Sequence, residues 1–169
     1  MSRRNGRILA VQALYAYDVG GSPLEDVLSF EWTKKMPQSD ALMPKLHAPK
    51  GKTAGNLSEG QVEQDEEALP SSRKVEMDFA RLLVSGTVSR IAEIDSRIKD
   101  HLAEDWEFDR LDRVTLAILR VSVFALLWQK DLTPTIVIDE AIAISKAFAV
   151  DDSFKFINAI LDTIAKEEI

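Results

Sequence analysis

The sequence of 169 residues contains no cysteine and only seven glycines and six prolines. Without cysteine, the chain can have neither a disulfide framework nor a thiolate metal site. It also lacks an apolar run as long as the ~20 residues that span a bilayer, because Arg120 interrupts its longest apolar stretch, Val114 to Trp128. The arginine-rich N-terminus has no uninterrupted apolar core of the kind found in a signal peptide. We therefore expect a cytoplasmic protein without a membrane segment.

What the sequence does contain favours one helical domain. Hydrophobic residues make up 46% of the chain and charged residues 29%, which is typical of a soluble globular protein. The length allows one domain with a proper core and makes a second full domain improbable, so we predict a single domain over residues 1–169. The net charge is −7, which would repel a polyanion at long range. Any binding of nucleic acid must therefore be local.

Apolar residues recur at helical spacing along most of the chain, and no segment is better explained as a β-strand. The first helix is expected to stop at Gly20-Gly21, and the second to begin with a capping box formed by Ser22 and Glu25. The third pattern is interrupted at Gly86, where another helix could approach closely. We predict an all-α fold with about six or seven helices and no sheet, in these segments: 3–19, 22–36, 75–98, 111–128, 134–148 and 151 to the end.

Residues 37–70 break this pattern. They hold four of the six prolines, three of the seven glycines and an acidic cluster at residues 63–67. Such a segment buries too little apolar surface to offset its ordering entropy, and it is too long for an ordinary connection. We interpret it as a mobile insertion. A regulated acidic interaction arm is the alternative.

The first two turns of the N-terminal helix carry three guanidinium groups, Arg3, Arg4 and Arg7. Residues three and four apart lie on one side of a helix, and Tyr15 follows nearly in line, about 16 Å from Arg4 at 1.5 Å per residue. Cations followed by an aromatic ring could pair with phosphates and stack on a base of single-stranded RNA. The plain alternative is that the arginines are merely solvated and that Tyr15 belongs to the core.

The start of the last helix carries a similar combination. Phe154, Lys155 and Phe156 cannot all point into the core, because consecutive helical side chains fan out by about 100°. An exposed or half-exposed phenylalanine beside a lysine and a helix N-terminus could form a platform for a base and a phosphate. The alternative is a loosely packed terminal helix. The two ends of the chain would reinforce each other if they met in space, as one cradle.

Two charged residues lie in apolar surroundings, Arg120 in the central helix and Glu140 in the next one. We predict that they form a buried ion pair, because an unpaired buried charge would cost several kcal/mol.

Catalysis has little support in the sequence. His47 lies in the low-complexity insertion and His101 in a connector, neither with a plausible catalytic serine or carboxylate partner, and neither a glycine-rich phosphate loop nor a metal-ligand spacing occurs. We therefore expect no enzyme activity, no catalytic residue, no cofactor and no metal.

Four stretches share a recognisable pattern when taken together: Arg3-Arg4 through Ala10 to Tyr15; Trp106 with Arg110-Leu111, Val114 and Ala117 to Arg120; Pro134 with Ile138 to Ala141; and Asp152-Ser153 with Lys155 to Asn158 and Leu161-Asp162. As a set they resemble the bacterial transcription antitermination factors of the NusB family. The resemblance covers both ends and most of the chain apart from residues 37–70.

The resemblance implies a NusB-like fold of two packed helical bundles and a non-catalytic function. It implies binding of single-stranded boxA RNA from ribosomal RNA leaders, together with the ribosomal protein NusE, in an antitermination complex on RNA polymerase. Carried onto this sequence, the RNA site would comprise Arg3, Arg4, Arg7, Tyr15, Asp152, Lys155, Phe156 and Asn158. The partner would dock at Val114, Thr115 and Ile118.

Two other interpretations stay open. The chain could be a helical protein-interaction module with little RNA affinity, self-associating as a homodimer through its central apolar helix. It could also be a domain detached from a ribosomal RNA cytosine methyltransferase, although no cofactor fold accompanies it.

Overall fold

The computed structural model describes residues 2–35 and 71–168, so the predicted insertion at 37–70 lies outside the described residues. Within those ranges the chain is all-α, with no strand, which confirms the predicted fold class. The elements are α1 (Ser2–Gly20), α2 (Leu24–Ser29), the 3₁₀ turn η1 (Glu31–Lys35), α3 (Ser71–Ser89), α4 (Ile91–Asp100), the 3₁₀ turn η2 (Phe108–Arg110), α5 (Arg113–Trp128), α6 (Pro134–Phe148) and α7 (Ser153–Glu167).

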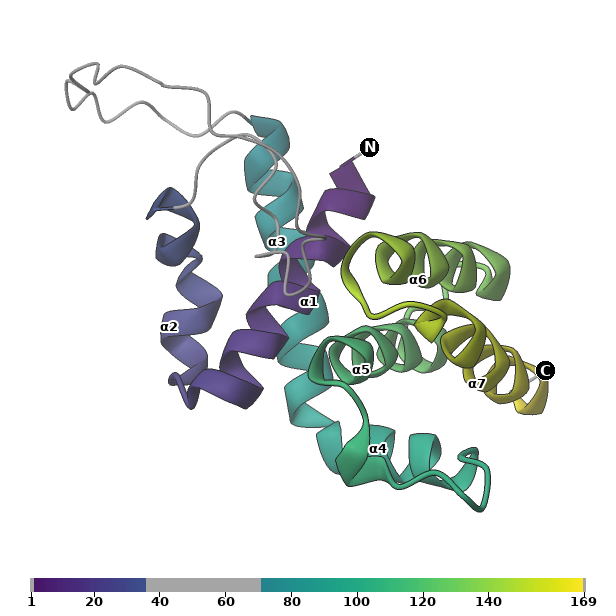
Figure 1. The fold of residues 1–169 in the computed structure, drawn as a ribbon. Helices are drawn as coiled ribbons and strands as arrows, with labels where there is room; N and C mark the ends of the chain where they lie inside the picture. The colour runs from purple at the N-terminus through teal and green to yellow at the C-terminus, as the bar shows by residue number, and fades with distance from the viewer. Residues whose placement is uncertain (1, 36–70, 169) are drawn as a thin grey trace, which may run out of the picture.

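The helices form two packed groups. In the first, α1 lies along α3, and the short α2 packs against both. In the second, α5 packs against α4, α6 and α7, and α6 also lies along α7. Helix α5 joins the groups because it also contacts α1 and α3 (Figure 1).

Helix α5 is buried on nearly every side, as its continuous apolar sequence predicts. The inward faces of α6 and α7 also match their helical periodicity: Val137, Ala141 and Ile144 are buried on α6, and Ile157 and Leu161 on α7. All of these side chains except Val137 belong to one core that both groups share.

Arg120 in the middle of α5 does not pair with Glu140, so that prediction was wrong. Its guanidinium donates to the carboxylate of Asp95 on α4, with Nε–Oδ1 at 2.7 Å and Nη2–Oδ2 at 2.8 Å. It also reaches Asp18 at the end of α1, with Nη1–Oδ1 at 3.4 Å. The face of α5 that carries Arg120 is directed toward α4 and the end of α1, whereas Glu140 on α6 faces the start of α1.

Gly86 permits a close helix contact, as predicted, but it does not interrupt α3. A Cβ atom added at this position would lie 2.1 Å from Cζ of Phe124 on α5, closer than any real contact. The helix continues through Gly86 to Ser89, and the chain bends at Arg90 before α4. The glycine therefore accommodates an aromatic ring of the neighbouring helix.

The second helix is much shorter than expected. Gly20-Gly21 does end α1, with Gly21 at a φ of +61°, but no side chain caps the start of α2. Helix α2 stops at Ser29, because Phe30 adopts the left-handed region with φ 55° while its ring is buried in the core. Burying the large Phe30 ring contributes more free energy than the intrinsic helix propensity of this segment, so the helix ends here.

Candidate nucleic-acid interface

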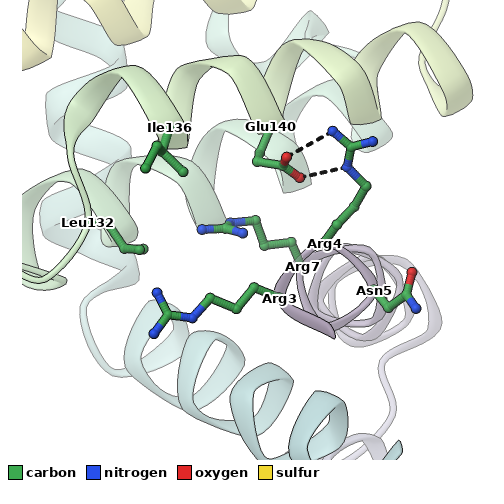
Figure 2. Close-up of a pocket in the computed structure, with 7 residues that line it drawn as sticks. All are labelled: Arg3, Arg4, Asn5, Arg7, Leu132, Ile136 and Glu140. Carbon is green, nitrogen blue, oxygen red and sulfur yellow. Dashed lines mark hydrogen bonds and ion pairs between the residues drawn. The ribbon is translucent and has the colours of Figure 1, made fainter. Parts of the chain in front are cut away.

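The first two turns of α1 border a hollow of about 520 Å³, here called the arginine hollow. Its other wall comes from the segment before α6 and from the first two turns of α6 (Figure 2). It is lined by Arg3, Arg4, Asn5, Arg7, Leu132, Ile136 and Glu140. Three of the predicted RNA-binding arginines thus share one concave site with a carboxylate and two apolar side chains.

Arg4 is joined to Glu140 by two parallel hydrogen bonds. Its Nε donates to Oε2 and its Nη2 donates to Oε1, both at 2.9 Å. This fork geometry is the strongest arrangement available to a guanidinium and a carboxylate. The hydrogen bond from Arg4 holds the pKa of Glu140 below its ordinary value, against the raising effect of burial. Glu140 is therefore an anion at neutral pH, and it ties α6 to the first turn of α1.

Arg7 lies at the inner end of the hollow and is only 6% exposed. Figure 2 shows its guanidinium directed into the hollow, between Glu140 and Arg3. Its Nε and Nη2 atoms have no hydrogen-bond partner among the described residues, and its Cζ lies 5.4 Å from the ring centroid of Phe79 on α3. Burial lowers the pKa of Arg7, an effect that the charge of Glu140 opposes. The side chain remains a cation because arginine is effectively always protonated.

Arg3 and Asn5 occupy the rim of the hollow. Arg3 is exposed and forms a loose ion pair with Asp131, with Nη2–Oδ2 at 3.7 Å, a contact worth little in water. The Asn5 amide turns away and donates to Glu76 on α3 at 2.9 Å.

The next residue, Gly6, permits the close approach of α1 and α3 that sets this geometry. A Cβ added there would lie 2.8 Å from Cδ1 of Phe79 and 2.9 Å from the Glu76 carbonyl oxygen.

A second hollow of about 490 Å³, here called the aromatic hollow, lies at the start of α7. It is built by the connector before α5, the first turn of α5 and the turn that leads into α7. Its lining residues are Trp106, Arg110, Leu111, Asp112, Thr115, Val150, Asp151, Asp152, Ser153, Lys155 and Phe156.

The aromatic hollow is dominated by a pair of stacked rings. Trp106 and Phe156 have centroids 4.5 Å apart and an interplanar angle of 15°. Asp152 precedes α7 with a φ of 65°, and its side chain makes no capping hydrogen bond to the helix backbone. Its carboxylate instead pairs with Lys155, Nζ–Oδ1 at 2.8 Å, and both side chains are well exposed. The half-buried position of Phe154 and Phe156 confirms that neither ring is sealed in the core.

The structure divides the predicted site between two hollows that share no lining residue in the described part of the chain, so the expectation of a single cradle was wrong. Helix α6 connects them: it begins at the arginine hollow and ends beside Val150 of the aromatic hollow. Its 15 residues correspond to about 22 Å at 1.5 Å per residue. Tyr15 and Asn158 line neither hollow; Tyr15 packs partly against the core, whereas Asn158 is exposed on α7.

The three predicted partner-binding residues are almost inaccessible. Val114, Thr115 and Ile118 are 5%, 3% and 1% exposed. Thr115 also donates its backbone N–H and its hydroxyl to Asp112 at the start of α5, at 3.0 and 3.1 Å. Of the three, Thr115 is the one that borders either of the two hollows described above, so the docking prediction for this face stays a prediction.

The sequence reasoning missed the role of Glu140 and the ring partnership of Trp106. We predicted Arg120 as the partner of Glu140, because helical periodicity indicates which residues face inward but not which helix they contact. Trp106 lies in an irregular connector, where no periodic signal exists.

Other site types have no support within residues 2–35 and 71–168. Those ranges contain no cluster of three histidine, aspartate or glutamate side chains arranged to hold a metal ion. None of the helices there combines the length and apolar character that crossing a membrane requires.

Comparison with known proteins identifies the family. Residues 41–166 match the model of the NusB family. The transcription antitermination protein NusB of Treponema denticola is 42% identical over 164 residues, covering 97% of this chain and 96% of that protein. Among solved structures, NusB of T. maritima superposes with a TM-score of 0.66 at 28% identity, covering 98% of this chain and 91% of that one.

A structure of the antitermination factors NusB and NusE in complex with double-stranded RNA also has this fold. Its TM-score is 0.67 at 23% identity, over 98% of this chain and 97% of that chain. With both the family match and the full-length relatives in agreement, the chain belongs to the NusB family of non-catalytic transcription antitermination factors.

Proposed function

We propose that this protein binds boxA-type single-stranded RNA of ribosomal RNA leaders together with NusE, as part of an antitermination complex on RNA polymerase. The observation that carries the proposal is the arginine hollow, where three guanidinium groups converge on one concave site of an otherwise acidic protein. Phosphodiesters are the natural ligands of such a site, since the planar guanidinium matches phosphate geometry.

The aromatic hollow supplies the complementary chemistry. Unpaired bases stack on aromatic side chains, a contact worth about 1–3 kcal/mol per base. The exposed face of Trp106 and its stacked neighbour Phe156 provide such a surface, and Lys155 offers a cation beside it. Asn158, exposed one turn further along α7, can hydrogen-bond to base edges. Tyr15 and Asp152 complete the proposed RNA-binding set.

The two hollows favour an extended single strand over a compact ligand. Helix α6 lies between them, and Glu140 of the first hollow is ten positions before Val150 of the second, about 15 Å at 1.5 Å per residue, so one ligand must follow the surface from a phosphate site to a base-stacking site. A duplex keeps its bases paired and offers no free face for stacking at the second hollow.

The solved NusB–NusE complex contains double-stranded RNA. Single-stranded and double-stranded probes must therefore be compared directly.

NusE is the proposed protein partner. Support comes from family membership and from the solved structure in which a NusB protein is bound to NusE. Because Val114, Thr115 and Ile118 all have almost no accessible surface, we propose that docking at this face uses the exposed rim around the start of α5, where Thr115 borders the aromatic hollow.

The experiment is a titration of labelled RNA in a salt series. The probes are a boxA-like single strand, its duplex and a scrambled strand, each with and without NusE. With about four phosphate contacts, the slope of log K against log salt should be near −3 for a single strand. NusE should tighten binding, and the boxA-like strand should bind best.

Absence of RNA binding at low salt, with or without NusE, would overturn this function. It would favour the alternative of a helical protein-interaction module. Sedimentation of the protein alone over a concentration series would then test whether that module self-associates as a homodimer.

A further inference from the structure

The three arginines of the arginine hollow are alike in sequence but occupy three different states. Arg3 is exposed on the rim, Arg4 is committed to a carboxylate, and Arg7 is buried with donors directed into the hollow. An incoming phosphate therefore meets three guanidinium groups of unequal availability. This difference in availability determines which guanidinium group binds the phosphate.

Arg4 is poorly placed to be the main phosphate ligand. The Nε and Nη2 atoms that would grip a phosphate as a fork already donate to Glu140. A phosphate could contact only the remaining hydrogens, or it would have to displace a carboxylate that belongs to the fold. Displacement would also untie α6 from α1.

Arg7 is placed as a phosphate receptor. Its Nε and Nη2 atoms are buried and unpartnered among the described residues, and they form the same fork that Arg4 uses on Glu140. The ring of Phe79 lies 5.4 Å from its Cζ and limits the orientation of the guanidinium plane. The guanidinium is already desolvated, so binding at Arg7 requires little further desolvation of the protein, and the buried Nε and Nη2 atoms need only turn further toward the hollow to reach a phosphate.

Glu140 is the other charge that governs this site. Among the described residues it is the one carboxylate that lines the hollow, and its field reaches both Arg4 and Arg7. While Arg4 holds Glu140 in the fork, the carboxylate is kept off Arg7. If Arg4 were lost, Glu140 would be free to turn toward the remaining buried cation.

We propose that Arg7 is the phosphate-binding residue of the arginine hollow, and that Glu140 sets its affinity as an internal competitor which Arg4 restrains. This inference rests on the RNA-binding function proposed above and specifies which residue performs it. Arg4 then acts as a positioning residue, through Glu140, rather than as a phosphate ligand.

A double-mutant cycle on RNA affinity tests the competition. Arg4→Gln should weaken RNA binding about tenfold, because it releases Glu140 onto Arg7. Glu140→Gln should tighten binding about threefold, since it removes the competing charge. The double variant Arg4→Gln/Glu140→Gln should recover to within about threefold of the parent affinity. A double variant as weak as Arg4→Gln would overturn the proposal, because Arg4 would then be a ligand itself.

Arg7→Lys tests the fork while keeping the charge. A lysine offers a point charge without two parallel donors, so RNA affinity should fall at least about tenfold. Circular dichroism and urea unfolding of the variant check that the fold is retained. Undiminished affinity in a folded Arg7→Lys variant would contradict the proposal.

A measurement without RNA separates this inference from the proposed function. Inorganic pyrophosphate is titrated into the parent protein while the arginine Nε–H signals are followed by NMR, assigned with the Arg4→Gln and Arg7→Lys variants. The Arg7 signal should shift and the Arg4 signal should stay nearly constant. A shift of the Arg7 signal alone, in a protein that does not bind RNA, would contradict the proposed function but would support this inference. A shift of the Arg4 signal without a shift of the Arg7 signal would contradict this inference, even if the protein binds RNA.

Discussion

The arginine hollow and the aromatic hollow have nearly equal volumes, about 520 and 490 Å³, but they are built on opposite principles. In the arginine hollow, the arginine side chains are held in place: Arg7 is buried, and Arg4 forms a fork of two hydrogen bonds with Glu140. In the aromatic hollow, the functional side chains are accessible to solvent: Trp106 is 49% exposed, and the Lys155–Asp152 pair is well exposed. The comparison indicates a preorganised phosphate site and an adaptable base site.

This difference follows from what supports each hollow. The first turns of α1 lie against α3 through Gly6, so the arginine backbones are fixed by helix packing. The aromatic hollow instead combines a connector, a turn and the start of α7, where Asp152 adopts a left-handed conformation. Loops of this kind open more easily than packed helices. Four predictions test the contrast.

The largest effect is expected from Arg120→Met, which removes the ion pairs that join α5 to α4 and to the end of α1. The buried Arg120–Asp95 fork joins α5 to α4, and removing one partner of a buried pair typically costs about 3–5 kcal/mol of unfolding free energy. Urea unfolding gives the value. The control is Arg113→Met, which also loses a bond to Asp18 but from an exposed side chain, and it should cost less than about 1 kcal/mol. Equal losses in the two variants would contradict the assigned pairing.

Gly6→Ala should damage the arginine hollow selectively. The added methyl group meets Phe79 and a backbone carbonyl, and such overpacking costs about 1–3 kcal/mol. The matched control is Gly20→Ala at the other end of α1, where the new atom has an ordinary contact at 3.5 Å with Ser22. Urea unfolding should rank Gly6→Ala well below Gly20→Ala in stability. The contrast between the hollows would fail if both glycines tolerated alanine equally.

Trp106→Ala should weaken the aromatic hollow without destabilising the fold strongly. The ring is half exposed, so its removal should cost about 1 kcal/mol in RNA binding, through lost base stacking. The salt slope should stay unchanged, because no phosphate contact is lost. Trp106→Phe preserves an aromatic face and should recover most of the affinity. A changed slope with unchanged affinity at low salt would indicate a phosphate role instead.

The smallest effect is on pH dependence, and it should have opposite signs at Glu140 in the arginine hollow and at His101, which lies in neither hollow. Arg4 lowers the pKa of Glu140 from 4.5, so the contribution of this pair to stability is complete above that pH and is lost as the pH falls through the folded-state pKa. The control is Glu140→Gln, in which this acid-dependent loss should disappear.

His101 should behave in the opposite way. Burial lowers its pKa, but the Arg97 carbonyl and Glu167 at the end of α7 together raise it above 6.5. Its Nδ1 lies 2.6 Å from the Arg97 carbonyl oxygen and its Nε2 lies 3.0 Å from Glu167, so both ring nitrogens must donate. The stabilisation is complete below pH 6.5 and is lost as the pH rises through the raised pKa. Urea midpoints at pH 6 and 8 measure it, and His101→Asn should remove the difference.

The sequence was sufficient to predict the all-α class, the buried face of α7 and the close approach at Gly86, because each depends on local spacing. It was insufficient for the partner of Arg120 and for the left-handed turn at Phe30. Arg4 and Glu140 are 136 positions apart, and helical periodicity identifies an inward face without identifying the helix opposite. For the same reason, two groups of promising residues were expected to form one site and instead line two.

The stacked pair at the aromatic hollow gives the protein a built-in optical reporter. Of the three tryptophans, Trp32 and Trp128 are partly buried against the core, and Trp106 alone stands half in solvent against Phe156. A nucleobase arriving on that indole should quench its emission, while the other two indoles supply a constant background. Unlabelled RNA could then be followed in real time by intrinsic fluorescence at this hollow, without any dye or tag.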